Sequence, residues 1–173
     1  DDAGEAEELA RRLDGLNIER QALDQRILEE ALTQIEQEAD LDRDAGFILV
    51  GDGWHPGVVG IVASRVVERY GRPTFLIAFD GDIGKGSGRS ISRFDLHAAL
   101  LSCGDLLERY GGHHMAAGFT IRRDRLDAFR DLLEGLRKLE RRATHDRLAV
   151  SRDPELAIAR AHGTHMIGDQ RPD

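Results

Sequence analysis

Gly46-Phe-Ile-Leu-Val50 and Thr74-Phe-Leu-Ile-Ala-Phe79 are the two apolar runs that decide the fold, and the loop Gly51-Asp-Gly-Trp-His-Pro-Gly57 follows the first of them. Both runs are short and rich in β-branched and aromatic residues, which predicts two buried strands. Apolar residues recur at helical spacing from Pro56, and Gly71 is placed to end that helix. A strand, a helix and a second strand in this order predict a right-handed crossover between parallel strands.

The chain beyond this unit alternates between extended and helical patterns. Residues 85–91 are rich in glycine and serine and are expected to be extended. Asp95 is predicted to cap a helix over Leu96–Cys103, and another helical turn is expected over Asp105–Tyr110. The segment Gly111–Gly118 is predicted to be a glycine-rich loop. Two glycine-rich stretches would thus flank a short helical region.

The C-terminal part is predicted to contribute one more strand and one amphipathic helix. The strand pattern covers Phe119–Arg122, and the helix pattern runs from Arg123 to Arg142. Residues 144–173 show weak periodicity and receive no assignment. The expected fold class is therefore α/β, with a mixed, roughly five-stranded sheet and flanking helices, preceded by a long connector helix.

Residues 5–38 are predicted to form that long helix. Leucine and isoleucine recur there at helical steps, while Gly15 and Asn17 predict a break near the middle. A coiled coil or a plain surface helix would show the same single stripe of apolar residues along the helix. Because so long a stripe needs something to pack on, we interpret residues 1–43 as a connector from an upstream domain and residues 44–143 as the domain that follows.

The net charge of −8 is unevenly distributed along the chain. Residues 1–45 hold 15 acidic and 5 basic side chains, so the rest carries a small positive excess. That remainder could accept a polyanion. No apolar run reaches the roughly 20 residues that span a bilayer, and the single cysteine, Cys103, suits a reducing compartment. These features predict a cytoplasmic globular protein without a membrane partner.

Three glycine-containing segments are candidate anion sites, and the first contains Ser87 and Arg89. In an extended segment these two side chains point to the same side, because the side-chain period of a strand is two. A hydroxyl beside a forked guanidinium is a suitable pair of donors for a phosphate. A flexible edge strand with a solvated arginine would have the same residues. We favour phosphate binding because the intervening glycines let the backbone approach a ligand closely.

The other two segments are Gly111–Gly118 and Gly51–Gly60, a strand-to-helix turn that contains His55. The N–H groups of a glycine-rich loop can form an anion-binding nest, and His113 or His114 could hydrogen-bond to a phosphate. A plain turn between two elements would have a similar composition. The adjacent histidines do not complete a metal site, because no cysteine or carboxylate lies at a suitable spacing. His55 precedes a helix N-terminus, which also attracts anions, whereas Trp54 beside it is interpreted as a packing residue.

Together these segments resemble the RecJ family of single-strand-specific exonucleases. The resemblance rests on Trp54–Arg65, Gly86–Ser90 and Gly111–Gly118, in that order. It covers residues 1–142 and concerns the accessory domain, of the DHHA1 type, that follows the catalytic Asp-His-His domain of that family. The segment Leu16–Gln21 is similar to the family's connector helix.

The resemblance implies a binding role for this chain and a metal site elsewhere. The family's manganese or magnesium site belongs to the upstream domain, and no Asp-His-His sequence occurs here, so no cofactor or metal ligand is assigned to this chain. Single-stranded DNA and the upstream domain are the implied partners, in a parent enzyme that degrades DNA 5′ to 3′ in repair and recombination. By motif position, the implied substrate-binding residues are Ser87, Arg89, Ser90, Gly111, Gly112, His113, His114, Ala117, Gly118 and His55. The chain alone is expected to bind without hydrolysing, with His113 in at most an assisting role.

Three alternatives stay open on the residues alone. An oligonucleotide or cyclic-dinucleotide phosphodiesterase would use the same glycine–histidine loop. A tRNA-binding module similar to that of alanyl-tRNA synthetases shares this loop, although zinc-ligand cysteines would be expected nearby. A non-catalytic interaction domain would use its acidic helix instead. If an Arg89→Ala variant lost affinity for single strands, the non-catalytic interaction domain would be disfavoured against the functions that bind phosphate.

Overall fold

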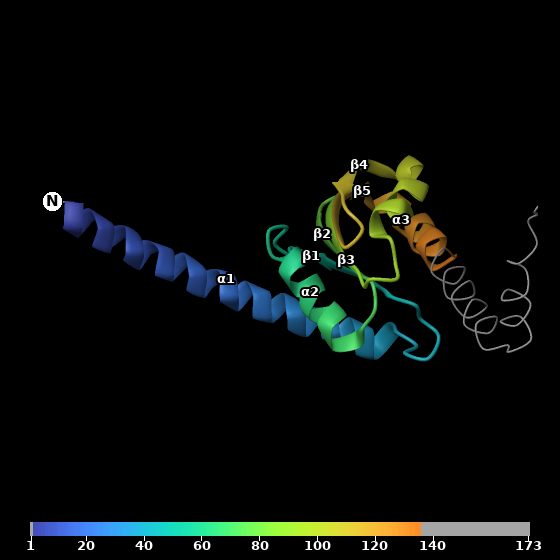
Figure 1. Ribbon diagram of the computed structural model, residues 1–173, viewed down its shortest axis with the longest axis horizontal. Helices are drawn as coiled ribbons and strands as arrows, with labels where there is room; N and C mark the ends of the chain where they lie inside the picture. Colours follow the sequence, from blue (N-terminus) through green and yellow to red (C-terminus); the bar gives the residue numbers. More distant parts are fainter. Residues whose placement is uncertain (1, 136–173) are drawn as a thin grey trace, which may run out of the picture. The chain divides into compact units, whose positions relative to one another are not determined.

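The structure, a computed structural model, describes residues 2–135 of the 173-residue chain. In this part of the chain five strands form one sheet in the order β1-β2-β3-β5-β4 (Figure 1). Their bounds are Phe47–Asp52 for β1, Thr74–Asp80 for β2, Ile83–Arg89 for β3, Leu107–Gly112 for β4 and Ala116–Arg122 for β5. β1 and β2 are parallel, and the other neighbouring pairs are antiparallel. The predicted mixed α/β sheet and its parallel pair are thus confirmed.

Helices cover the two faces of the sheet and close two separate hydrophobic cores (Figure 1). On one face α1 (Asp2–Glu38) and α2 (Val59–Tyr70) pack against β1 and β2. On the other face α3 (Leu96–Ser102) and a helix over residues 126–135 enclose a second core. That second core contains a cluster of three aromatic rings, those of Phe75, Phe119 and Phe129. The two faces of the sheet therefore have different coverings.

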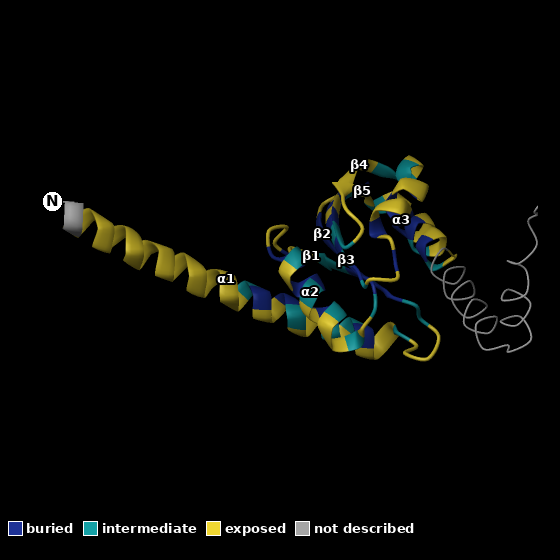
Figure 2. Cartoon of the chain, viewed as in Figure 1, coloured by how far each residue is buried: buried dark blue, intermediate teal, exposed yellow. Residues whose placement is uncertain are grey.

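α1 is one continuous helix, so the predicted break near Gly15 is wrong. A glycine costs only about 1 kcal/mol relative to alanine inside a helix, which a helix of this length tolerates. Asn17 does not cap a new helix, because its side chain accepts hydrogen bonds from Arg20 one turn later. The first half of α1 is exposed, whereas its second half is buried on one side (Figure 2).

Two polar contacts fasten the second half of α1 to the sheet. Trp54 Nε1 donates to Glu30 Oε2 at 2.6 Å, and the indole is only 3% exposed, which confirms its packing role. The side-chain amide of Gln34 donates to the Val50 oxygen at 2.7 Å and accepts from the Val50 N–H at 3.2 Å. Gln34 thereby pairs the free edge of β1 as a neighbouring strand would.

The start of α2 differs from the prediction, whereas its end agrees with it. The helix begins at Val59 and not at Pro56, because the intervening residues form a turn in which the Val58 N–H donates to the His55 oxygen at 2.9 Å. Gly71 ends the helix in the left-handed conformation, with φ of 63°, as predicted. The first turn of α2 faces β3, so its position determines which residues of the helix lie next to that strand.

The hairpin of β4 and β5 corrects two predictions. A short 3₁₀ turn over Gly104–Leu106 is followed by β4 at Leu107, so Asp105–Tyr110 is not a helical turn. Gly111–Gly118 is not a loop, since its two ends belong to β4 and β5 and only His113–Met115 turn between them. β4 is largely exposed and lacks apolar alternation, so its extended form depends on pairing with β5.

The remaining predicted elements agree with the structure as far as it is described. Asp95 caps α3 by accepting from the Ala98 N–H at 2.9 Å. The expected C-terminal helix begins with a 3₁₀ turn at Arg123–Arg125 and continues as α-helix to residue 135. Its expected end at Arg142 and the tail over residues 144–173 lie outside the described residues. None of the described helices is both long and apolar enough to cross a membrane.

Candidate functional site

The alternation along β3 gives each side of the sheet a different set of residues. Gly84, Gly86 and Gly88 are buried, and Cβ atoms built on them would lie no more than 2.9 Å from core side chains. Successive side chains of a strand point to opposite faces. Ser87 and Arg89 therefore project to the other face, on which α2 lies.

Ser87 and Arg89 form a pair on this face, as the strand period predicts. Arg89 Nη1 donates to Ser87 Oγ at 2.9 Å and to the Gly88 main-chain oxygen at 2.8 Å. Both side chains are partly buried, and this burial lowers the pKa of Arg89 from its ordinary value. A guanidinium that has lost part of its water interacts more strongly with an anion than a fully solvated one does.

The first turn of α2 lies directly against this pair. A Cβ atom on Gly60 would be 2.8 Å from Arg89 Nη2 and 2.9 Å from Ser87 Oγ. Neither a capping side chain nor an acidic residue occupies the N-terminus of α2. The positive end of the helix dipole is thus unopposed beside a guanidinium, which favours an anion. Gly60 is the last residue of the predicted anion segment Gly51–Gly60, but the sequence does not indicate which residue of that segment faces β3.

A row of glycines continues from Ser87 across the neighbouring strands. Ser87 pairs with Gly118 of β5, and Gly118 pairs with Gly111 of β4. A Cβ atom would have open space at Gly111 and only an ordinary 3.8 Å contact at Gly118, so the fold does not require glycine at either position. Gly112 differs, because its φ is 143° and a Cβ atom there would lie 2.5 Å from the Ala116 oxygen. This position therefore does require glycine. The row leaves a flat floor of backbone next to Ser87.

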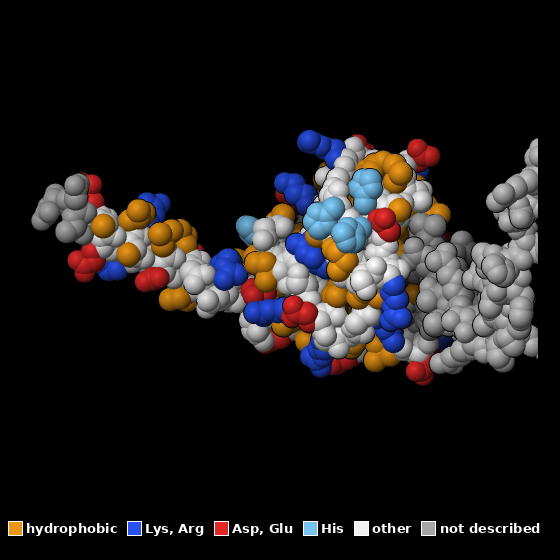
Figure 3. Space-filling view, in the orientation of Figure 1, with side chains coloured by type: hydrophobic (Ala, Val, Ile, Leu, Met, Phe, Trp, Pro, Cys, Tyr) orange, Lys and Arg blue, Asp and Glu red, His pale blue; other side chains and the backbone are white. Residues whose placement is uncertain are grey.

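His113 and His114 stand at the turn of the hairpin, at the end of this floor. Both are exposed, and their ring centroids are 5.8 Å apart. The His113 N–H donates to the Ala116 oxygen at 2.9 Å, and His113 Nδ1 accepts from the Met115 N–H at 3.3 Å. Figure 3 shows histidine side chains grouped on one face of the molecule with basic side chains next to them.

Three of the predicted site residues are not brought to this face. Ser90 is buried, and its hydroxyl donates to the Phe94 main-chain oxygen at 2.7 Å, which makes it a structural residue. Ala117 points into the core between its exposed neighbours. His55 lies in the loop before α2, where its Nδ1 accepts from the Gly57 N–H. The motifs around β3 and β5 include Ser90 and Ala117 because an extended segment presents residues to both faces of a sheet.

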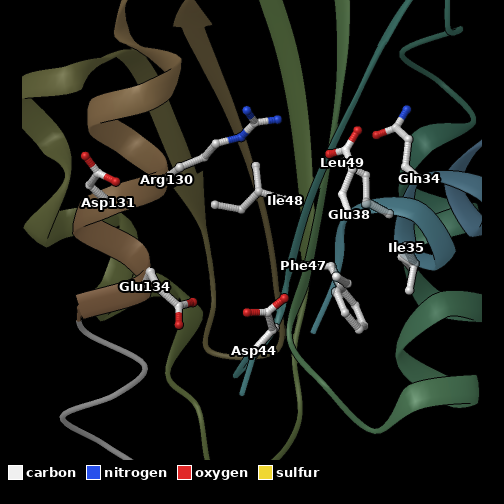
Figure 4. Close-up of a pocket in the computed structure, with 12 residues that line it drawn as sticks. Gln34, Ile35, Glu38, Asp44, Phe47, Ile48, Leu49, Arg130, Asp131 and Glu134 are labelled. Carbon is white, nitrogen blue, oxygen red and sulfur yellow. The ribbon is translucent and has the colours of Figure 1, made fainter. Parts of the chain in front are cut away.

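A hollow elsewhere has the wrong charge for a polyanion. It measures about 320 Å³ and lies between α1, β1 and the helix over residues 126–135 (Figure 4). Arg130 is the only cation among the described residues that line it, and it reaches toward the middle of the hollow in Figure 4. The acidic lining residues are Glu38, Asp44, Asp131 and Glu134. The open face of β3, β5 and β4, which carries the Ser87–Arg89 pair beside Gly60, is the candidate site for an anionic ligand.

Comparison with known proteins identifies the class of this fold. The DHHA1 domain family matches residues 44–138, which is more than half of the chain. The chain therefore belongs to the DHHA1 domain family. Its domain is of the RecJ type, since its relatives are RecJ proteins, and the predicted resemblance is confirmed.

One curated relative and two solved structures illustrate this likeness. The chain is 44% identical over 135 residues to the single-stranded-DNA-specific exonuclease RecJ of Bacillus subtilis, covering 77% of this chain and 17% of the relative. RecJ from Thermus thermophilus in complex with Mg²⁺ has a TM-score of 0.71 and 40% identity, covering 80% of this chain and 21% of that one. Exonuclease RecJ bound to manganese has a TM-score of 0.70 and 41% identity, with coverage of 79% and 33%. The chain thus spans less than a fifth of the length of the Bacillus relative.

Proposed function

We propose that this domain binds the phosphate backbone of single-stranded DNA, with Ser87 and Arg89 at a 5′-terminal phosphate. The parent protein would be an exonuclease that acts on single-stranded DNA 5′ to 3′. The observation that carries the proposal is the glycine floor beside this pair. Gly111 and Gly118 have room for side chains that the sequence does not supply, which suits a surface on which a polymer lies close to the backbone.

The donors at one end of this floor match the chemistry of a phosphate. The guanidinium of Arg89 offers a fork of N–H groups, and the Ser87 hydroxyl that accepts from it keeps its own proton to donate. The N-terminus of α2 adds its partial positive charge at Gly60. Three sources of positive potential then converge on one phosphate group.

The histidines at the hairpin turn extend the contact with the 5′ end of the strand. His113 and His114 are exposed beyond the floor, and the contact of His113 with the Met115 N–H uses only its Nδ1. A neutral or protonated imidazole can donate a hydrogen bond to a phosphate oxygen. We assign them, together with Ser87 and Arg89, to the binding of the 5′-terminal phosphate.

Hydrolysis belongs to another part of the parent protein in this proposal. Two RecJ relatives were solved with Mg²⁺ and with manganese. Within the part of this chain that the structure describes, no three His, Cys, Asp or Glu side chains gather as a set of metal ligands, so these residues do not fit a divalent metal site. The domain's own contribution is to bind and orient the strand for a metal site supplied elsewhere.

The exposed half of α1 supports an intramolecular contact with the upstream domain. Leu9, Leu13 and Leu16 recur at helical spacing and are each more than half exposed. Clustered exposed apolar side chains are a mark of an interaction surface. We infer that this stripe packs on the domain that carries the metal site and so holds the two parts of the enzyme together.

Arg89→Ala is expected to weaken binding of a 5′-phosphorylated oligothymidylate about 10-fold, because a hydrogen bond to a charged group contributes about 1.5–3 kcal/mol. Arg89→Lys keeps the charge but loses the fork, so we expect it to restore only part of the affinity. Fluorescence anisotropy with a labelled strand of about 12 nucleotides, a length within known single-strand site sizes, measures both.

Two controls make this experiment decisive. Arg12→Gln removes a charge from the exposed half of α1 and is expected to leave binding unchanged. A strand with a 5′-hydroxyl is expected to bind more weakly than the phosphorylated strand, and Arg89→Ala is expected to erase that difference. Equal affinity of the wild-type chain for the two strands would contradict the assignment of a 5′-phosphate. Binding of a cyclic dinucleotide but of no oligonucleotide would contradict the exonuclease substrate.

A further inference from the structure

A second set of polar side chains lies on the open face, one row beyond Ser87. Lys85 of β3 pairs with Thr120 of β5, and Thr120 pairs with Arg109 of β4. Residues that pair directly in antiparallel strands project from the same face of the sheet. Lys85 lies two residues before Ser87, so this row and the Ser87 row share one face.

The two cations of this row are uncompensated. Lys85 and Arg109 are exposed, and neither forms an ion pair or a side-chain hydrogen bond within residues 2–135. The neighbouring Arg122 and Arg123 differ, because acidic side chains pair with both of them. Lys85 and Arg109 are thus two positive charges without an internal partner, with Glu108 adjoining Arg109 and Asp80 lining a hollow together with Lys85.

The dimensions of the row suit a single phosphate group. Neighbouring strands lie about 4.8 Å apart, so Lys85 and Arg109 start about 10 Å from each other, with the shorter Thr120 between them. Two long side chains can close over such a gap and meet an oxygen of one phosphate, with the threonine hydroxyl as a third donor. The row is displaced from the Ser87 row by two residues, or about 6.6 Å along the strand. A step of this size corresponds to one nucleotide of an extended strand.

We propose that Lys85, Arg109 and Thr120 form a second phosphate subsite, which takes an internal phosphodiester of single-stranded nucleic acid. This inference rests on the proposed function, since the terminal phosphate at Ser87 and Arg89 sets the register of the strand. The backbone then follows β3 from Arg89 toward Lys85. Asp80 and Asp82 lie at the turn between β2 and β3, and their negative charge limits the path at that end.

The test compares two double variants of the 173-residue chain that change the net charge equally. Lys85→Gln/Arg109→Gln removes the subsite, whereas Arg12→Gln/Arg20→Gln removes two exposed charges from α1. The probe is a 5′-phosphorylated oligothymidylate of about 12 nucleotides, bound over a series of salt concentrations. Each lost contact with a single-strand phosphate lowers the slope of log K against log salt by about 0.7. The subsite variant loses one phosphate contact, so it should lose about 0.7 from this slope and bind about 10-fold more weakly at low salt, while the α1 variant keeps the wild-type slope.

Competition by thymidine 5′-monophosphate separates the two subsites. It occupies only the terminal site, so its affinity should be unchanged in Lys85→Gln/Arg109→Gln and reduced in Arg89→Ala. An unchanged salt slope in the subsite variant, together with weakened binding in Arg89→Ala, overturns the second subsite alone. A wild-type chain that binds neither probe overturns the proposed function and this inference together. Thermal unfolding of all variants verifies that substitutions at these exposed positions leave the fold intact.

Discussion

Gly60→Ala is expected to lower the affinity for a 5′-phosphorylated strand at least about 100-fold. The new methyl group would stand 2.8 Å from Arg89 Nη2 and 2.9 Å from Ser87 Oγ, so both donors must move from their present positions. Two hydrogen bonds to a charged phosphate would be lost at once, each of about 1.5–3 kcal/mol. The loss should therefore equal that of the double variant Ser87→Ala/Arg89→Ala and exceed that of either single one.

The fold should survive this change, which separates Gly60 from an ordinary packing residue. Alanine is favoured over glycine in a helix by about 1 kcal/mol, and this gain offsets the cost of displacing the flexible end of Arg89. Urea unfolding and anisotropy on the same preparation measure stability and binding together. Gly15→Ala is the matched control, because a Cβ atom there meets nothing within 4 Å. Undiminished binding by Gly60→Ala would show that Ser87 and Arg89 do not hold the phosphate.

Gly86→Ala is expected to destabilise the domain by about 3 kcal/mol or more. A Cβ atom on Gly86 would lie 2.2 Å from Phe119 Cζ, deep in the second core. The Phe119 ring has little freedom to withdraw, because it packs against the rings of Phe75 and Phe129 with centroids 6.0 Å and 5.2 Å away. Relief therefore requires the backbone of β3 to shift away from β5. The urea midpoint should fall, and the amount of folded protein at moderate urea should fall with it.

Gly118→Ala provides the control for this second substitution. Gly118 lies on the adjacent strand, but a Cβ atom there points to the open face and meets only the Gly86 oxygen, at 3.8 Å. We expect its free energy of unfolding to stay within about 0.5 kcal/mol of the wild type. If Gly86→Ala were as stable as Gly118→Ala, the assignment of the two faces of β3 would be wrong. The binding site would then have to be sought on the other side of the sheet.

Much of the fold can be predicted from local patterns, with instructive exceptions. β1 and β2 carry continuous apolar runs because both of their faces are covered, so the runs are visible in the sequence. β4 was not predicted as a strand, since its residues are mostly exposed and its shape depends on β5. The start of α2 was misplaced because a turn at Pro56 delays the first helical residue.

Part of the site could likewise be predicted from a local pattern, the two-residue period of a strand. The strand period places Ser87 and Arg89 together, and their hydrogen bond agrees with that prediction. The period does not say which face of a strand is covered by helices. Ser90 and Ala117 come from the same motifs, yet both point inward and serve the fold. Only the packing of the second core decides between the two faces.

Three motifs along the chain indicated the family that it resembles, and local patterns predicted its two buried strands and the pairing of Ser87 with Arg89. Each motif and each of these patterns depends on residues that are near neighbours along the chain. Three relations required the folded structure: Gly60 presses against that pair, Gly111 and Gly118 continue its row, and one face of β3, β5 and β4 stays open. Those relations join segments separated by helices and turns. They arise from cross-strand hydrogen bonding and core packing, for which no local pattern carries a signal.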